Sequence, residues 1–503
     1  MQPVLKEKVI DKGVWFDHGF ANTPVCCPSR SSILTGKFVH NHGARNNSKI
    51  GGCASDDWYN GPEKDALPVH LERAGYFSLY AGKYLNNYGL GGRAKDVHTP
   101  PGWSEWFGLH GNSRYYNYTI QDNDKAVQHG DSYEHDYLTD VLARRLETFL
   151  DTALTKRKAT GQPFFAMIGT PAAHASFTPA PQYEDTAAGL DAPRPPSYNK
   201  VFQDKHQTVR DLSPMSATQI EQSDRAYRQR LGTLRSVDDM IAKLYNKLEA
   251  ADEDNDTYFF YTADHGFHLG EFAMGFDKRQ LYETDTRVPY FVRGPGVLQG
   301  AVRHEPISHV DLAPTIIDIA AGGVPDNWDG RSFLALLNQN KATWNVDTLI
   351  QYYGEGSVES CGSGFIRYAG DVALADGSYI PAPCDGANNT YSCVRRATPD
   401  LSVNDIFCEF TCVDASHRPV PCPADQPEGY GEYYDLNTDP WQIENKARVP
   451  KPTPLTRCRP SPFPNPSAKS SPSESTISAT VSDKPAASTS DFLGMNTTSR
   501  PQK

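Results

Sequence analysis

The chain has 503 residues, which is enough for one large catalytic domain with additions or for about three ordinary domains. Its 49 Lys and Arg against 61 Asp and Glu give a net charge of −12, which argues against a nucleic-acid-binding protein, because such proteins need a basic face. Hydrophobic residues make up 38% of the chain, so wholesale disorder is excluded, and no apolar run is long enough to span a membrane.

The first 16 residues do not resemble a signal peptide, because Lys6, Glu7 and Lys8 interrupt any apolar stretch. Other features nevertheless favour the secretory pathway. Ten cysteines, crowded among Gly, Pro and Asn, are typical of disulfide-linked loops in an oxidising compartment. Five glycosylation sequons agree with this, at Asn46, Asn117, Asn255, Asn388 and Asn496. We therefore expect an extracellular or lysosomal protein whose true start lies upstream of this chain.

Up to about residue 330 the chain alternates strand-like and helix-like segments. Short apolar runs rich in aromatic residues predict buried strands at 76–80, 163–169, 257–261 and 288–292. Apolar residues spaced three and four apart predict helices over 138–154 and 231–248. This alternation predicts an α/β fold, with a mostly parallel sheet covered by helices on both faces.

Polar residues follow three of the predicted strands. They are the pair Gly82-Lys83, the segment Pro171 to His174, and the pair Asp264-His265. Ligands of open α/β sheets bind beyond the carboxyl ends of the strands, so these residues predict one shared site.

The remainder of the chain has a different amino-acid composition. Residues 331–450 are rich in Gly, Tyr, Cys and Asn and predict a smaller C-terminal α+β subdomain after a catalytic domain over 1–330. Residues 451–503 are rich in Pro, Ser and Thr and predict a disordered tail.

The most specific motif is CCPSRSSILTG, which runs from Cys26 to Gly36. Pro28 suits the start of a helix and Gly36 its end. Cys26 is therefore expected at a helix N-terminus, where backbone N–H groups favour an anion, and Arg30 adds a donor suited to tetrahedral oxyanions.

This motif resembles the signature of the formylglycine-dependent (type I) sulfatases, and the resemblance extends over about residues 1–450. Its other blocks look like the N-acetylglucosamine-6-sulfatase branch. They are VWFDHGFANTPVCCPSR, LERAGYFSLYAGKYLNNYG, PPGWSEWFGLHGNSRYYNYT, YTADHGFHLGEF, DKRQLYETDTRVPYFVRGPG and VDLAPTIIDIA. The resemblance implies an alkaline-phosphatase-like fold and the hydrolysis of O-sulfate esters of sugars or aryl compounds.

The resemblance also implies roles for individual residues. Cys26 matches the cysteine that is oxidised to formylglycine (3-oxoalanine), whose hydrate is the nucleophile. Arg30 matches the residue that holds the hydrate, Lys83 and Lys278 match two sulfate-binding lysines, and His174 matches the histidine that protonates the leaving alcohol. The implied partners are a sulfated carbohydrate or small sulfate ester and the formylglycine-generating enzyme, with no nucleic acid and no membrane span.

A divalent cation, with calcium as the expected ion, is implied at Asp264, His265 and the modified Cys26. His265 stands where the family more often has asparagine, and imidazole also suits zinc or manganese. His304 and His309 match no family motif, and we expect them to be structural.

Family members also begin with a strand that ends in paired aspartates, which supply half of the metal's oxygen ligands. Only 25 residues precede the signature here, and Asp11 and Asp17 are isolated. We therefore expect an unpaired sheet edge and a poor or inactive enzyme. Two alternatives stay open: a phosphoester or phosphonate hydrolase of the same superfamily, and a non-catalytic, truncated relative that binds sulfated glycans.

Overall fold

The structure is a computed structural model. It describes residues 2–90, 97–339, 342–355, 389–413, 420 and 429–447. The expected tail over 451–503 therefore lies outside the described residues.

The first half of the central sheet has the strand order β6-β5-β4-β3-β7. Its parallel part consists of β4 (Glu105–Leu109), β3 (Phe77–Lys83) and β7 (Phe164–Gly169). The hairpin of β5 (Thr119–Asp122) and β6 (Lys125–Gln128) extends it in antiparallel fashion. The strands predicted over 76–80 and 163–169 are thus confirmed.

The second half has the order β12-β1-β11-β8. It consists of β12 (Ala301–Arg303), β1 (Val14–Phe16), β11 (Tyr290–Arg293) and β8 (Phe259–Thr262). Strand β11 runs antiparallel to both β1 and β8, whereas β1 and β12 are parallel. The α/β class is confirmed, but the sheet is mixed rather than uniformly parallel, because an apolar run does not encode the direction of its strand.

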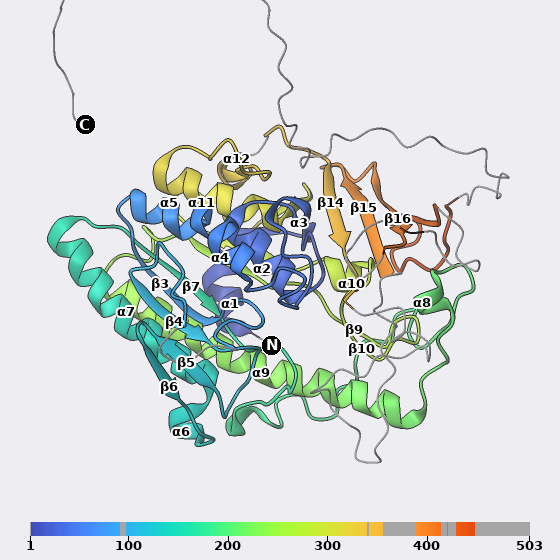
Figure 1. Cartoon of the computed structure of the whole chain (residues 1–503), viewed down its shortest axis with the longest axis horizontal. Helices are drawn as coiled ribbons and strands as arrows, with labels where there is room; N and C mark the ends of the chain where they lie inside the picture. Colours follow the sequence, from blue (N-terminus) through green and yellow to red (C-terminus); the bar gives the residue numbers. More distant parts are fainter. Residues whose placement is uncertain are drawn as a thin grey trace, which may run out of the picture. The chain divides into compact units, whose positions relative to one another are not determined.

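Helices cover both faces of these strands (Figure 1). On one face, α7 (Leu138–Thr160) and α9 (Ala217–Ala250) pack in a single core with β3, β4 and β5. On the other face lie α2 (Cys26–Thr35), α5 (Leu67–Arg73) and α11 (Leu312–Ala321). Both predicted helices are therefore present.

Local sequence explains where the two long helices begin and end. Ser216 and Gln219 form a capping box at the start of α9, each side chain bonding the other residue's backbone N–H. Helix α7 ends at Gly161, which adopts a left-handed conformation with φ of 76°.

The other short elements connect and flank this frame. They are α1 (Pro3–Leu5), the π-helical turn η1 (Lys6–Ile10), β2 (Gly19–Phe20), α3 (Val39–His42), α4 (Asp56–Asn60), η2 (Pro62–Asp65), α6 (Tyr133–Asp136), η4 (Pro181–Tyr183), α8 (Gln207–Arg210), β9 (His268–Leu269), β10 (Phe276–Asp277), α10 (Glu283–Thr286), β13 (Ile307–Ser308), η5 (His309–Asp311) and α12 (Leu334–Asn338).

A gap separates the two halves, which no described strand joins, so they are two separate sheets. Among the described strands, β7 pairs only with β3, and β8 pairs only with β11. All residues of β7 and β8 line a cavity of about 910 Å³, so their apolar side chains are only half-buried. The expected unpaired sheet edge is therefore confirmed, and it occurs on both sides of the gap.

The described part of the C-terminal region is a four-stranded antiparallel sheet. It consists of β14 (Asp347–Tyr352), β15 (Thr390–Ala397), β16 (Asn404–Thr411) and β17 (Gly431–Asp435). A disulfide joins Cys393 to Cys408 across β15 and β16. Residues 1–452 form one compact unit, so the boundary at residue 330 remains a prediction.

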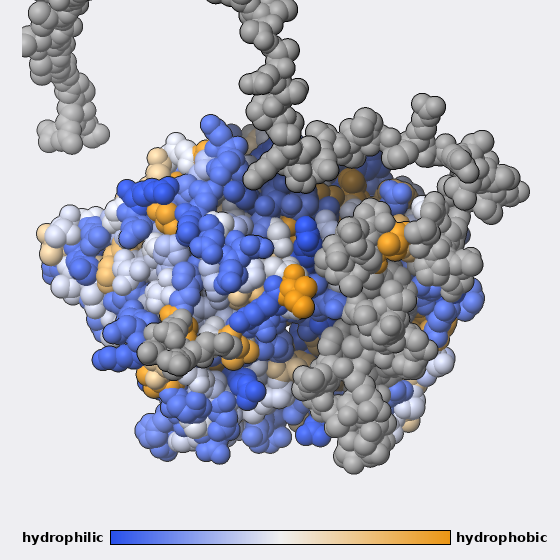
Figure 2. All heavy atoms as spheres, viewed as in Figure 1, coloured by the Kyte–Doolittle hydropathy of each residue, from blue (hydrophilic) through white to orange (hydrophobic). Residues whose placement is uncertain are grey.

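The face of the molecule in Figure 2 is mostly hydrophilic, with hydrophobic residues in small scattered groups. Among the described helices, none combines the length and apolar character needed to cross a bilayer.

The sequons differ in accessibility, which predicts their glycosylation. Asn117 and Asn255 are exposed, whereas Asn46 is 6% exposed and its side chain accepts a hydrogen bond from the Ser48 backbone. Folded protein secreted from a eukaryotic host is expected to carry glycans at Asn117 and Asn255 and none at Asn46, as measured by glycopeptide mass spectrometry. A glycan on Asn46 would contradict this packing. Asn388 and Asn496 lie outside the described residues.

Candidate active site

The signature motif forms α2, which starts at Cys26 itself, two residues before Pro28. Val25 before it is extended, and Gly36 closes the helix with φ of 62°. The helix is almost wholly buried, and Cys26 is only 1% exposed. The predicted helix is confirmed, but it begins two residues earlier than Pro28 indicated, so Cys26 lies in its first turn rather than before it.

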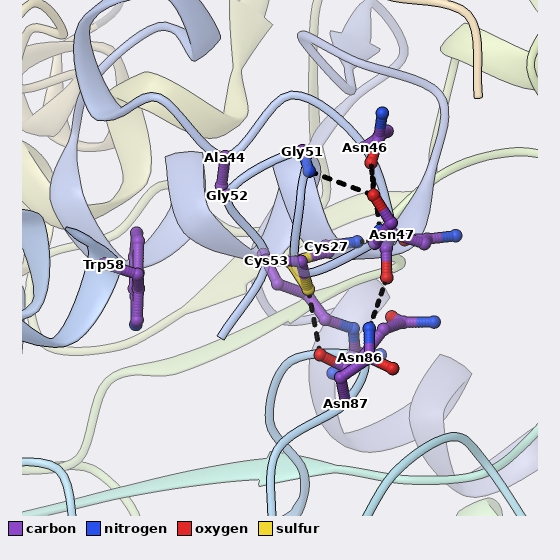
Figure 3. Close-up of a disulfide and its surroundings, with 12 residues drawn as sticks. Cys27, Ala44, Asn46, Asn47, Gly51, Gly52, Cys53, Trp58, Asn86 and Asn87 are labelled. Atoms are coloured by element: carbon purple, nitrogen blue, oxygen red, sulfur yellow. Dashed lines mark hydrogen bonds between the residues drawn. A yellow bond between two sulfur atoms is a disulfide. The ribbon is translucent and has the colours of Figure 1, made fainter. Parts of the chain in front are cut away.

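The two adjacent cysteines differ, because Cys27 is disulfide-bonded (Figure 3) and Cys26 is a free thiol. Cys27 forms a disulfide with Cys53, and the Cys27 backbone N–H donates to Asn47 Oδ1 at 2.9 Å. Cys26 is the free cysteine among the residues that the structure describes. The disulfide thus fixes the first turn of α2 and leaves Cys26 as the thiol open to chemical change. Four further cysteines lie outside the described residues, namely Cys361, Cys384, Cys422 and Cys458.

Asp264 and His265 follow β8 and reach the first turn of α2. His265 Nε2 lies 3.4 Å from Cys26 Sγ, while His265 Nδ1 donates to the Gly266 carbonyl at 2.7 Å. Asp264 Oδ2 accepts from Arg30 Nε at 2.9 Å. Ligand atoms of Cys26, Asp264 and His265 all lie within 4.8 Å of one another.

Lys83 and His174 approach from the other half of the sheet. Lys83 ends β3, is 1% exposed and donates from Nζ to Asn112 Oδ1 at 2.7 Å. His174 follows β7; its Nδ1 donates to the Ala175 carbonyl at 2.6 Å, which leaves Nε2 to make its hydrogen-bonding contact with Cys26. Gly82 is required before Lys83, because a Cβ there would lie 2.1 Å from the Gly169 carbonyl.

Lys278 follows β10, and its Nζ lies 3.1 Å from Asp277 Oδ1. It interacts electrostatically with Cys26, His174 and Lys83. The structure therefore brings every sequence-predicted site residue together. Their catalytic roles remain predictions.

The electrostatics of the site follow from its buried cations. Burial alone would raise the pKa of the Cys26 thiol, but Lys83 and His265 outweigh it and hold that pKa well below its ordinary value. The pKa of Asp264 is likewise lowered, against burial, by His265, Arg30 and Lys83. Burial lowers the pKa of Lys83, and also that of His174, which the cations Lys83 and Lys278 depress further.

Three residues of the site were missed by sequence reasoning. Asn112 orients Lys83, and Asp277 pairs with Lys278. Arg230, on α9, donates to the Ala173 carbonyl at 2.6 Å and lies 3.9 Å from the Phe267 ring centre. Only Asp277 carried a signal, since it adjoins Lys278 in the sequence.

The cluster of Cys26, Asp264 and His265 offers few oxygen ligands to the implied cation. Calcium takes six to eight oxygen ligands, and this cluster offers one carboxylate, one imidazole and one sulfur. The described residues thus fit calcium poorly. They fit a formylglycine at position 26 well, since the thiol is free and surrounded by cations.

The comparisons with known proteins agree with this geometry. The family model "Sulfatase" matches residues 1–323. The N-acetylglucosamine-6-sulfatase of Homo sapiens is 40% identical over 462 residues, covering 89% of this chain and 78% of that protein.

Two solved structures share the fold. One, in complex with its substrate D-glucosamine-2-N,6-O-disulfate, has a TM-score of 0.65 at 22% identity and covers 88% of each chain. The phosphonate monoester hydrolase of Silicibacter pomeroyi has a TM-score of 0.60 at 19% identity, covering 90% of this chain and 87% of that one. The family model and the human relative confirm the predicted resemblance: the chain belongs to the sulfatase family, whose members are hydrolases.

Proposed function

We propose that this protein hydrolyses O-sulfate esters of a sulfated sugar or small aryl compound through a formylglycine formed at Cys26. The carrying observation is that Lys83, His174, Lys278 and His265 converge on one free, buried cysteine at a helix N-terminus.

Position 26 suits a nucleophile that can regenerate itself. A hydrated aldehyde supplies one hydroxyl to attack sulfur and a second whose loss of a proton expels sulfate, which a serine ester could not do. The family generally uses this modified residue, and its formation here would need the formylglycine-generating enzyme as a partner.

The buried cations would bind the sulfate group. Lys83 and Lys278 place ammonium groups next to position 26, and Arg30 adds a guanidinium already held by Asp264. Because these charges are held in place beforehand, they would stabilise the negative charge that builds on the sulfate oxygens during transfer.

His174 is placed to assist departure of the alcohol. Its Nδ1–H is engaged by the Ala175 carbonyl, so Nε2 is the nitrogen available to deliver a proton to the leaving oxygen. Lys278 interacts electrostatically with His174, and its ammonium group would keep the leaving oxygen close to His174 Nε2.

A 6-O-sulfated amino sugar is the substrate class that the relatives favour. The human relative is named N-acetylglucosamine-6-sulfatase, and the solved neighbour holds D-glucosamine-2-N,6-O-disulfate. A secreted or lysosomal location is supported by the two disulfides between described cysteines.

We also propose that catalysis by this chain is limited by weak cation binding. Asp264 Oδ2 is engaged by Arg30, which leaves Oδ1 and the softer His265 for an ion. With so few oxygen ligands, calcium should bind with a dissociation constant on the order of 10⁻³ M or weaker.

Metal dependence therefore tests this function. Turnover of an aryl sulfate is expected to be low after EDTA treatment and to rise with Ca²⁺ only in the millimolar range, because one carboxylate holds the ion. Asp264→Asn should remove the Ca²⁺ response, while Asp256→Asn, at an exposed carboxylate, should keep it. Full activity at micromolar Ca²⁺ would contradict the proposed impairment. A preference for the matching phosphate ester would instead favour the phosphohydrolase alternative.

A further inference from the structure

A second cluster of metal-ligating side chains lies outside the site described above. Asp17 and His18 form the turn between β1 and β2, and His304 lies between β12 and β13. His18 Nδ1 is 2.5 Å from Asp17 Oδ1, and His304 Nδ1 is 2.8 Å from Asp17 Oδ2. One ligand atom from each residue lies within 4.8 Å of the other two.

The backbone that carries these side chains is fixed on both sides. Before the cluster, β1 pairs with β12 through Phe16 and Arg303; after it, β2 pairs with β13 through Gly19 and Ile307. Two further backbone bonds lie within the cluster, from Asp17 N to Arg303 O at 3.1 Å and from Ile307 N to His18 O at 3.1 Å. The three ligands are thus held in place without a bound ion, so little ordering entropy opposes binding.

The donor set selects a class of metal. Two imidazole nitrogens and one carboxylate oxygen are the ligands of many tetrahedral zinc sites, whereas calcium requires more oxygens. In the present arrangement, the single Asp17 carboxylate lies between the two Nδ1 atoms, one on each oxygen. A cation bound by these atoms would replace the two hydrogen bonds, with each neutral ring keeping its hydrogen on Nε2.

The three side chains of the cluster differ in their exposure to solvent. The His18 side chain is 7% exposed and that of Asp17 is 17% exposed, whereas that of His304 is 38% exposed. The cluster therefore opens to solvent beside His304, where an ion can enter and a water molecule can complete its coordination.

We propose that Asp17, His18 and His304 form a zinc site that links the β1–β2 turn to the β12–β13 loop. This site is independent of the proposed sulfatase chemistry, and it gives His304 a role that sequence patterns did not assign.

The test is titration of the purified full chain with Zn²⁺ by calorimetry, and with Co²⁺ by absorption. The unmodified chain should bind Zn²⁺ at this cluster, and His304→Gln should weaken that binding by roughly 100-fold. Asp17→Asn, which keeps the side-chain shape, should do the same. Cys26→Ala removes a ligand of the other cluster and should leave this binding unchanged.

The Co²⁺ spectrum separates the two clusters. Binding at Asp17, His18 and His304 gives visible ligand-field bands without a sulfur-to-cobalt charge-transfer band, because no cysteine takes part. Circular dichroism confirms that each variant is folded. Because the Cys26 cluster can also bind zinc, the deciding comparison is made in Cys26→Ala protein. Zinc binding by folded Cys26→Ala that survives the addition of His304→Gln or Asp17→Asn, or no zinc binding by Cys26→Ala itself, would overturn the proposal.

Discussion

Replacing Cys26 by alanine is expected to reduce sulfate ester hydrolysis by roughly a thousandfold or more, because it removes the proposed nucleophile that lies among the cations of the site. The fold should persist. The side chain is small, Cys26 makes no disulfide, and the adjacent Cys27–Cys53 bond still anchors α2. Turnover of an aryl sulfate at saturating Ca²⁺, alongside thermal unfolding, measures both effects.

The control for this result is chemical. In protein from a secretory host, the peptide containing Cys26 should show a mass change for the exchange of sulfur for oxygen and the loss of two hydrogens. Cys26→Ser should become sulfated without turnover, because a serine ester lacks the second hydroxyl. Unaltered thiol in an active preparation, or normal turnover by Cys26→Ala, would exclude the proposed nucleophile.

Replacing His174 by alanine is expected to slow hydrolysis of an alkyl sugar sulfate by about 10²- to 10⁴-fold, the usual contribution of a general acid. An ester of an acidic phenol should lose far less, because its leaving group needs no proton. The measurement is kcat/KM across a series of esters that differ in leaving-group pKa, with a steeper dependence expected for the variant.

The matched control is Lys83→Met, which removes a cation of the sulfate pocket. It should slow all esters to a similar extent, since sulfate binding does not depend on the leaving group. The pH profile adds a second readout. Burial lowers the pKa of His174, so its proton is lost as the pH rises through a value below the ordinary histidine pKa of about 6.5. Activity that needs this proton should therefore fall with rising pH, with a midpoint below about 6.5. Equal losses for all esters in His174→Ala would contradict the general-acid role.

Sequence reasoning predicted the strands and the site residues that follow them, because both leave local signals. A run such as Phe164–Gly169 is apolar and short, and a polar residue after a strand marks the ligand-binding edge. Asn112 left no such signal. It contacts Lys83 from 29 positions away, and nothing in its neighbours indicates that contact.

The N-terminal segment shows the same limit. Its charged residues gave no clear pattern, yet residues 3–10 are helical. Leu5 and Val9, four residues apart, are buried in the core, and the Asp238 carboxylate accepts hydrogen bonds from the backbone N–H groups of Val4 and Leu5. Such tertiary contacts decide the conformation, and they cannot be read from the segment alone.

The unpaired edges of β7 and β8 give Arg30 a mechanical importance beyond its charge. Its guanidinium donates to the Lys83 carbonyl at 2.7 Å on one side of the divide and to Asp264 at 2.9 Å on the other. No described strand bridges the two sides, so this side chain adds a polar link to the apolar packing that both sides share with α7 and α9. The position of Lys83 relative to Cys26 therefore depends in part on this planar group, and its loss would let the two residues move apart while each sheet stays folded.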